Sequence, residues 1–173
     1  FQKLENMGVH DLGEINAAMP ALRKGGKAKR QPKHLIVLAR NYVGLRNLYK
    51  LISLAHLEHF KRYPIMPKSI INENREGLII GSACEAGELF QALLEHKSDD
   101  ELKRIASFYD FLEIQPLANN MFMLAKGMAK DVEDLKNYNR TIIRLGEELG
   151  KLVVATGDVH FLNPEDEIFR HIL

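Results

Sequence analysis

The sequence is nearly free of cysteine, since Cys84 is the only one among 173 residues. A lone cysteine cannot form an internal disulfide, so the pattern of a disulfide-stabilised secreted domain is excluded and we expect a cytoplasmic protein. No apolar run approaches the roughly 18 residues needed to span a bilayer. The N-terminus also lacks the shape of a signal peptide. The chain therefore gives no sign of a membrane partner.

An excess of charge of either sign is also missing. The chain carries 24 basic and 23 acidic residues, a formal net charge of +1. That balance does not mark the whole chain as a nucleic-acid-binding protein, although charge can be local. With 46% hydrophobic and 27% charged residues, the composition is typical of one globular domain with a substantial core. The chain starts at Phe1 instead of Met, which fits either a segment of a longer protein or a trimmed one.

Several well-known catalytic motifs are missing as well. The sequence has no G-x-x-x-x-G-K-[ST] phosphate loop, no G-x-G-x-x-G and no G-x-S-x-G. It contains no CxxC pair and no basic strand face carrying an aromatic stripe. Nucleotide-loop, dinucleotide-binding and serine-hydrolase chemistry therefore have no support in the sequence.

The first 33 residues differ from the rest in their pattern. We expect a short helix over Asp11–Met19. Residues Leu22–Lys33 are basic, contain two glycines and have few apolar side chains, which predicts a solvated linker or, alternatively, an arm that contacts phosphates. The expected division is thus a helix and basic linker over residues 1–33, followed by a second region over residues 34–173.

From residue 34 onward, short apolar runs alternate with segments of helical periodicity. This alternation predicts an α/β fold with a parallel sheet or barrel. Four strands are too few to close a barrel, and an eight-stranded barrel usually needs about 250 residues, so we expect an open sheet or a partial barrel. The expected strands are His34–Arg40, Gly77–Gly81, Phe111–Gln115 and Lys151–Thr156, and the expected helices are Gly44–Phe60, Ala86–His96, Asp100–Tyr109, Asp131–Gly150 and one starting at Asn163.

Candidate functional residues lie next to these strands. Asp158 and His160 follow the last strand and are two positions apart, so in an extended segment their side chains face the same way. A carboxylate and an imidazole that converge in this way suit Zn, Mn or Fe. The alternative is an ordinary loop aspartate beside a core or surface histidine, because the D-x-H spacing is common.

Cys84 and His34 are two further candidates. Cys84 follows a strand and precedes a helix, where a thiolate is favoured and can bind a soft metal. The alternatives are a small buried apolar residue, or a nucleophile with His160 as its base, although no third residue to orient that base is evident. His34 opens the first strand and is either a ligand or an ordinary histidine.

Taken together, four segments resemble the PHP domain of bacterial DNA polymerase III alpha subunits, in the PolC form typical of low-GC Gram-positive bacteria. The motifs that carry the resemblance are H-L-I-V-L-A-R-N with G-L-R-N-L-Y-K-L (34–51), E-G-L-I-I-G-S-A-C-E-A-G-E (76–88), F-L-E-I-Q-P (111–116) and V-V-A-T-G-D-V-H-F-L-N-P-E-D (153–166). The resemblance runs from about residue 34 to the end.

The resemblance implies a partial (β/α) PHP-type distorted barrel, in which seven strands present up to nine metal ligands. His34, Cys84, Asp158 and His160 are the family ligands that this chain would supply. The opening His-x-His motif and the other ligands are not in the sequence, so the divalent metal cluster (Zn, Mn or Fe) is expected to be incomplete in this chain. Residues 1–33 would follow the exonuclease that PolC carries inserted in its PHP domain, and residues 34–173 would form the C-terminal part of that domain.

The function implied is that of a segment of a replicative DNA polymerase III in bacterial DNA replication. The parent enzyme would be a DNA-directed DNA polymerase with 3'-5' exonuclease activity, partnered by DNA and other replisome subunits, whereas this segment alone would be inactive. The metal site would be structural or would hydrolyse phosphoesters or pyrophosphate. Two alternatives stay open: a fragment of a free-standing PHP phosphoesterase, and a non-catalytic α/β interaction module in which Cys84, Asp158 and His160 never meet.

Overall fold

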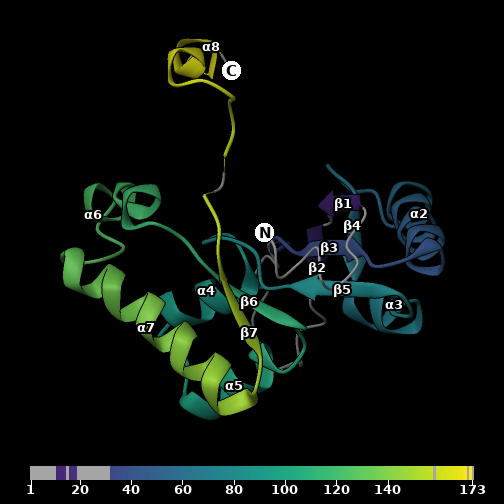
Figure 1. Ribbon diagram of the computed structural model, residues 1–173, viewed down its shortest axis with the longest axis horizontal. Coiled ribbons are helices and arrows are strands. Elements are labelled where there is room, and N and C mark those ends of the chain that lie inside the picture. Colours follow the sequence, from purple (N-terminus) through teal and green to yellow (C-terminus); the bar gives the residue numbers. More distant parts are fainter. Residues whose placement is uncertain (1–10, 15, 19–31, 158, 171, 173) are drawn as a thin grey trace.

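The computed structural model describes residues 11–14, 16–18, 32–157, 159–170 and 172. Its main sheet has five strands in the order β1-β3-β5-β6-β7, and β2 pairs with β4 in a separate two-stranded sheet (Figure 1). The strands are β1 Asp11–Glu14, β2 Asn16–Ala18, β3 Ile36–Ala39, β4 Ile65–Pro67, β5 Leu78–Gly81, β6 Phe111–Ile114 and β7 Leu152–Ala155.

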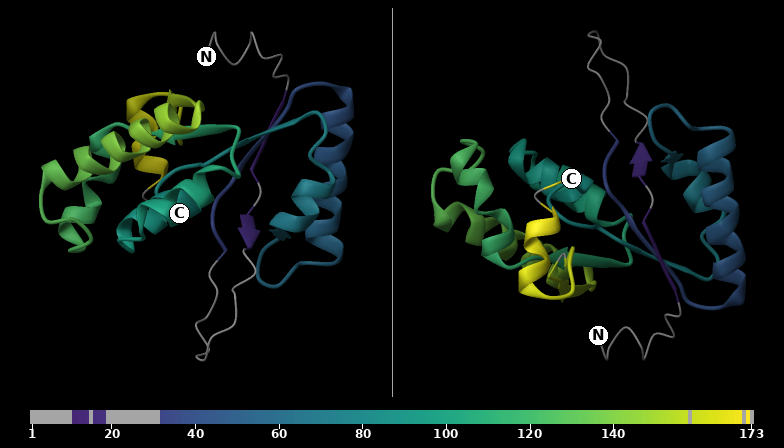
Figure 2. Two further views of the ribbon diagram at one scale, coloured as in Figure 1. Left: turned by 90° about the horizontal axis from the view of Figure 1, so that it is seen from below. Right: turned by 90° about the horizontal axis from the view of Figure 1, so that it is seen from above.

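The helices alternate with the strands along the described chain. Figure 1 shows α2 and α3 beside β3 and β5, whereas α4, α5 and α7 lie toward the β6–β7 end of the sheet, and the two views of Figure 2 agree. The helices are α2 Tyr42–Leu57, α3 Lys68–Glu73, α4 Glu88–Leu94, α5 Asp99–Ala106, α6 Phe122–Ala125, α7 Val132–Leu149 and α8 Glu167–Arg170, with short 3-10 turns at Leu117–Asn120 and Pro164–Asp166.

Mixed α/β architecture with an open sheet confirms the expected partial barrel. None of the described helices is long and apolar enough to cross a bilayer.

Helix ends follow the sequence signals. Asn41 caps α2 by accepting a hydrogen bond from the Gly44 N–H at 2.9 Å, so α2 starts before the predicted Gly44. Asp131 caps α7 by accepting from the Asp134 N–H at 3.0 Å. Gly150 ends α7 with a φ of 63°, a left-handed conformation that favours glycine. The predicted cap and terminator of α7 are both confirmed.

The predicted helix over Asp11–Met19 is wrong. Residues 11–14 form β1, which pairs antiparallel with β3, and residues 16–18 form β2, which pairs with β4. Without β1, the backbone N–H and C=O groups along one edge of β3 would have no strand to pair with. This pairing overrides the weak helical preference of so short a segment. The predicted linker falls mostly on residues 22–31, which lie outside the described residues.

The prediction of a parallel sheet holds for only part of the sheet. Strands β5, β6 and β7 are parallel to one another, but β3 is antiparallel to β5, with Ile36 opposite Gly81. Between β3 and β5 the chain passes through α2, β4 and α3 instead of a single crossover helix. It therefore re-enters the sheet in the opposite direction, so that the start of β3 and the end of β5 share one edge.

The two faces of the sheet are buried in different ways. One face packs against the helices in the main hydrophobic core, to which Val37, Ile80 and Leu112 belong. The other face carries a smaller cluster of Leu38, Ile79 and Phe111, with Ile36, Leu152 and Val154 packed against it. Because side chains alternate across a strand, these residues project away from the face that the helices cover, and in a barrel such a face would line the interior.

Candidate metal site at one edge of the sheet

One edge of the sheet collects the polar residues singled out in the sequence. The C-terminal ends of β5, β6 and β7 lie at this edge because the three strands are parallel. The antiparallel orientation of β3 brings its beginning to the same edge, and the His34 N–H donates a hydrogen bond to the Ala86 carbonyl at 3.1 Å. His34, which lies two residues before β3, is thus next to residues that follow β5.

His34 and Cys84 meet at this edge. The His34 Nδ1 lies 3.7 Å from the Cys84 Sγ, and both side chains are partly buried. A nitrogen and a sulfur bound to one tetrahedral zinc ion would be roughly 3.5 Å apart, given bond lengths of about 2.0 and 2.3 Å. The distance also fits a weak hydrogen bond that involves the thiol. The two donors therefore fit a shared divalent ion without rearrangement of the backbone.

The loop that carries Cys84 is tightly built. Ala83 has a φ of 59°, a left-handed conformation that non-glycine residues seldom adopt. A Cβ added to Gly87 would lie 2.2 Å from the Ser82 carbonyl oxygen, so the chain can close on itself there only with glycine. The Gly87 N–H donates to the Cys84 carbonyl at 2.9 Å. These constraints hold the backbone of the loop at Cys84 in one conformation.

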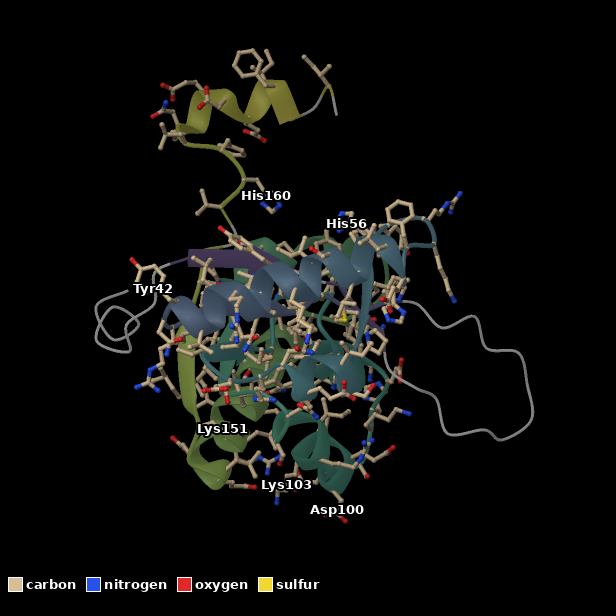
Figure 3. The ribbon with its side chains drawn as sticks, turned by 90° about the vertical axis from the view of Figure 1, so that its right-hand side faces the viewer. Tyr42, His56, Asp100, Lys103, Lys151 and His160 are labelled. Atoms are coloured by element: carbon tan, nitrogen blue, oxygen red, sulfur yellow. The ribbon has the colours of Figure 1, made fainter. Side chains whose placement is uncertain are left out.

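The other two predicted ligands are placed less completely. Asp158 lies outside the described residues. His160 is exposed and lies on the extended segment between β7 and α8, and α8 stands clear of the rest of the fold (Figure 3). In the part of the chain that the structure describes, no three His, Cys, Asp or Glu side chains form a group that could hold one ion. The structure thus brings together His34 and Cys84, but not the full predicted set.

A buried polar group at this edge was not singled out from the sequence. Glu113, near the end of β6, is only 8% exposed. Its Oε1 accepts hydrogen bonds from the Thr156 hydroxyl at 2.6 Å and from the Gln115 amide at 3.4 Å. The Oε1 of Gln115 is buried and has no hydrogen-bond partner among the described residues. An acidic residue inside the otherwise apolar run Phe111–Ile114 was the signal available in the sequence.

A second buried network anchors the helix that follows the Cys84 loop. Glu88, the first residue of α4, forms an ion pair with Lys68 and accepts a hydrogen bond from the Tyr109 hydroxyl at 3.3 Å. The Lys68 Nζ also lies 4.2 Å from the centre of the Phe108 ring. Burial lowers the pKa of Lys68, against the opposing effect of Glu88. Burial, followed by the Glu88 charge, raises the pKa of Tyr109 well above its ordinary value.

Comparison with known proteins gives one consistent family. Residues 7–116 match the PHP domain. The chain is 55% identical over 174 aligned residues to the DNA polymerase III PolC-type of Clostridium perfringens (strain 13 / Type A), which covers all of this chain and 12% of that protein. It is 48% identical over 166 residues to the protein of the same name from Bacillus subtilis (strain 168), which covers 96% of this chain and 11% of that protein. The chain thus spans about a tenth of the length of these relatives.

Proposed function

Because the chain belongs to the PHP domain family, we propose that it is a segment of a PolC-type replicative DNA polymerase and contributes ligands to a divalent metal site. PHP domains generally depend on metal. The observation that carries the proposal is the 3.7 Å approach of the His34 Nδ1 to the Cys84 Sγ at the shared strand edge. In this proposal His34, Cys84, Asp158 and His160 are ligands, and the remaining ligands come from parts of the parent protein outside this chain.

The chemistry of His34 and Cys84 indicates how each would bind a metal ion at this edge of the sheet. The Cys84 thiolate and the His34 imidazole hold Zn, Mn or Fe, with zinc best suited to the sulfur donor. When bound, such a metal lowers the pKa of a coordinated water and polarises a phosphoryl oxygen. The tight Cys84 loop would hold the thiolate in place, and the ion pair of Glu88 with Lys68 anchors the helix that follows this loop. The site has either a structural role or a role in phosphoester or pyrophosphate hydrolysis.

The names of the relatives support a proposal for the whole protein. We propose that the parent acts in the bacterial cytoplasm as a DNA-directed DNA polymerase with a 3'-5' exonuclease, and that DNA and other replisome subunits are its partners. Residues 1–33 would follow the exonuclease insertion, and residues 34–173 would complete the PHP domain. The chain by itself is proposed to be inactive, because its set of ligands is incomplete. No observation favours a free-standing PHP phosphoesterase.

Metal content tests the proposal. The full-length parent, purified without chelator, should contain stoichiometric metal by elemental analysis. Cys84→Ala and the double substitution Asp158→Ala/His160→Ala should each reduce it, whereas His56→Ala, at an exposed histidine on α2 (Figure 3), should not. Metal that survives both ligand variants would rule out the ligand assignment. A parent without metal would favour the non-catalytic module.

The role of the metal needs a second measurement on the same samples. If the site is structural, chelator should lower the melting temperature of the parent, and Cys84→Ala should leave the hydrolysis of phosphodiester and pyrophosphate substrates unchanged, because the proposed exonuclease is a separate site. If the site is hydrolytic, Cys84→Ala should remove a metal-dependent part of the product release of the wild-type protein. Cleavage that survives Cys84→Ala would have to come from another site in the parent.

A further inference from the structure

A buried carboxylate lies on the strand between the two strands that precede the proposed ligands. Glu113 belongs to β6, which is flanked by β5 on one side and β7 on the other. Cys84 follows β5, and Asp158 and His160 follow β7. The side chains of Phe111 and Glu113 project to the same face because they are two positions apart, and Phe111 belongs to the interior cluster. Carboxylates are seldom buried in such a place unless they are hydrogen-bonded.

The hydrogen bonds of Glu113 run toward β7. The Thr156 hydroxyl donates to the Glu113 Oε1 at 2.6 Å, a length typical of a strong bond to an ionised acceptor. The backbones of both residues are fixed as well. The Glu113 N–H donates to the Ser82 Oγ at 2.9 Å, and the Thr156 N–H donates to the Ile114 carbonyl at 3.1 Å. Glu113 thus links the ends of all three parallel strands.

Thr156 follows β7 directly and lies two residues before the first of the proposed ligands in this segment. It immediately precedes Gly157, which gives the following segment few constraints of its own. The Gly157 carbonyl accepts a hydrogen bond from the Asn119 side chain at 2.8 Å. The hydrogen bond from Thr156 to Glu113 therefore holds the start of this segment against β6.

We propose that Glu113 is a positioning residue of the metal site and acts through the Thr156 hydroxyl to hold the start of the segment that carries Asp158 and His160. The inference rests on the proposed function. Partners that orient metal ligands from behind typically change metal affinity by about 10–100-fold when they are removed. A merely structural role would instead affect the stability of the fold and leave the affinity for metal unchanged.

The test is the metal affinity of the full-length parent, measured by competition with a chromophoric chelator for Zn²⁺ and for Mn²⁺. Thr156→Val keeps the shape of the side chain but removes the hydroxyl, and Glu113→Leu removes the acceptor. Each should weaken metal binding by about 10–100-fold. Thr156→Ser and Glu113→Gln retain the donor and the acceptor, so they should bind close to wild type. The Glu113→Leu/Thr156→Val double variant should be no weaker than the worse single variant, because both changes break one bond.

The outcomes separate this inference from the proposed function. If Asp158→Ala/His160→Ala loses metal while Thr156→Val binds as tightly as wild type, Glu113 has no positioning role although the metal site is real. The positioning role is equally overturned if Thr156→Val only lowers the melting temperature. If Thr156→Ser is as weak as Thr156→Val, the hydroxyl is not the link. A parent that binds no metal overturns both proposals.

Discussion

Substitution of Lys68 by methionine should destabilise the fold more than most single changes. The side chains of Lys68 and Glu88 are only 14% and 7% exposed, so water does not solvate either charge well. Removal of one member of a buried ion pair leaves the other charge uncompensated and typically costs about 3–5 kcal/mol. Lys68→Met also removes the cation that lies 4.2 Å from the centre of the Phe108 ring, a contact worth about 1–2 kcal/mol when desolvated.

The companion variants show whether the charge itself is responsible. Glu88→Gln keeps an acceptor for the Tyr109 hydroxyl, and the remaining Lys68 can become neutral, because burial already lowers its pKa. The free energy of unfolding should therefore fall less in Glu88→Gln than in Lys68→Met, by about 1–3 kcal/mol. The double variant Lys68→Met/Glu88→Gln has no buried charge at this position, and it should be more stable than Lys68→Met alone.

Urea unfolding of the chain, followed by far-UV circular dichroism, measures these differences. With a typical slope of about 2 kcal/mol per M, a loss of about 4 kcal/mol lowers the midpoint by roughly 2 M. Lys136→Met is the matched control, because Lys136 pairs with Glu133 on the exposed surface of α7 and such pairs contribute little. A midpoint for Lys68→Met equal to that of the control would refute the argument, as would a double variant less stable than Lys68→Met.

Three further predictions concern other parts of the fold. A Cβ on Gly44 would lie 1.8 Å from the Gly77 carbonyl oxygen, so Gly44→Ala should cost about 1–3 kcal/mol in urea unfolding despite the better helix propensity of alanine; a stabilised variant would contradict this close approach. Asp131→Ala should cost about 1 kcal/mol through loss of the α7 cap, and Asp131→Asn, which can still cap, should not; equal losses would argue against capping. Hydrogen bonds from Arg144 and then Lys103 lower the pKa of Asp99 to about 2, so the stability that Asp99 contributes is present above its ordinary value of 3.8 and is lost as the pH falls through about 2. NMR titration should give this midpoint in wild type and a higher one in Arg144→Gln, and a wild-type midpoint near 3.8 would contradict it.

The sequence predicted the elements of the fold better than their directions. Hydrophobic periodicity located the helices α2 and α7 and the strands β3, β5, β6 and β7, because each buries one apolar face or run. Periodicity says nothing about which way a strand runs, so the antiparallel β3 was not foreseen. The helix predicted over Asp11–Met19 does not form, because residues 11–14 pair with β3. This pairing joins residues far apart in the sequence, so local periodicity could not predict it.

The candidate site was predictable only in part for the same reason. Cys84, Asp158 and His160 stand out because they follow strands, which is where parallel α/β folds collect functional groups. His34 precedes its strand, and only the antiparallel pairing of Ile36 with Gly81 explains why it reaches Cys84. The prediction of these four residues as ligands remains to be tested by metal analysis.

Strand alternation gives the edge its chemical character. On the interior face, apolar side chains in the middle of the sheet give way to polar side chains at this edge. Phe111 is followed by Glu113, and Val154 is followed by Thr156, each two positions further along its strand. His34 extends the same pattern in the opposite direction, because it lies two positions before Ile36 and β3 runs antiparallel to β5. Across the sheet on this face Phe111 lies beside Leu152, and Glu113 lies beside Val154. Because Glu113 is buried, its hydrogen bonds act in a low local dielectric, where electrostatic interactions are stronger than in water. Strands from elsewhere in the parent that complete the barrel would therefore have to present polar residues near Glu113 and apolar residues against Phe111 and Leu152.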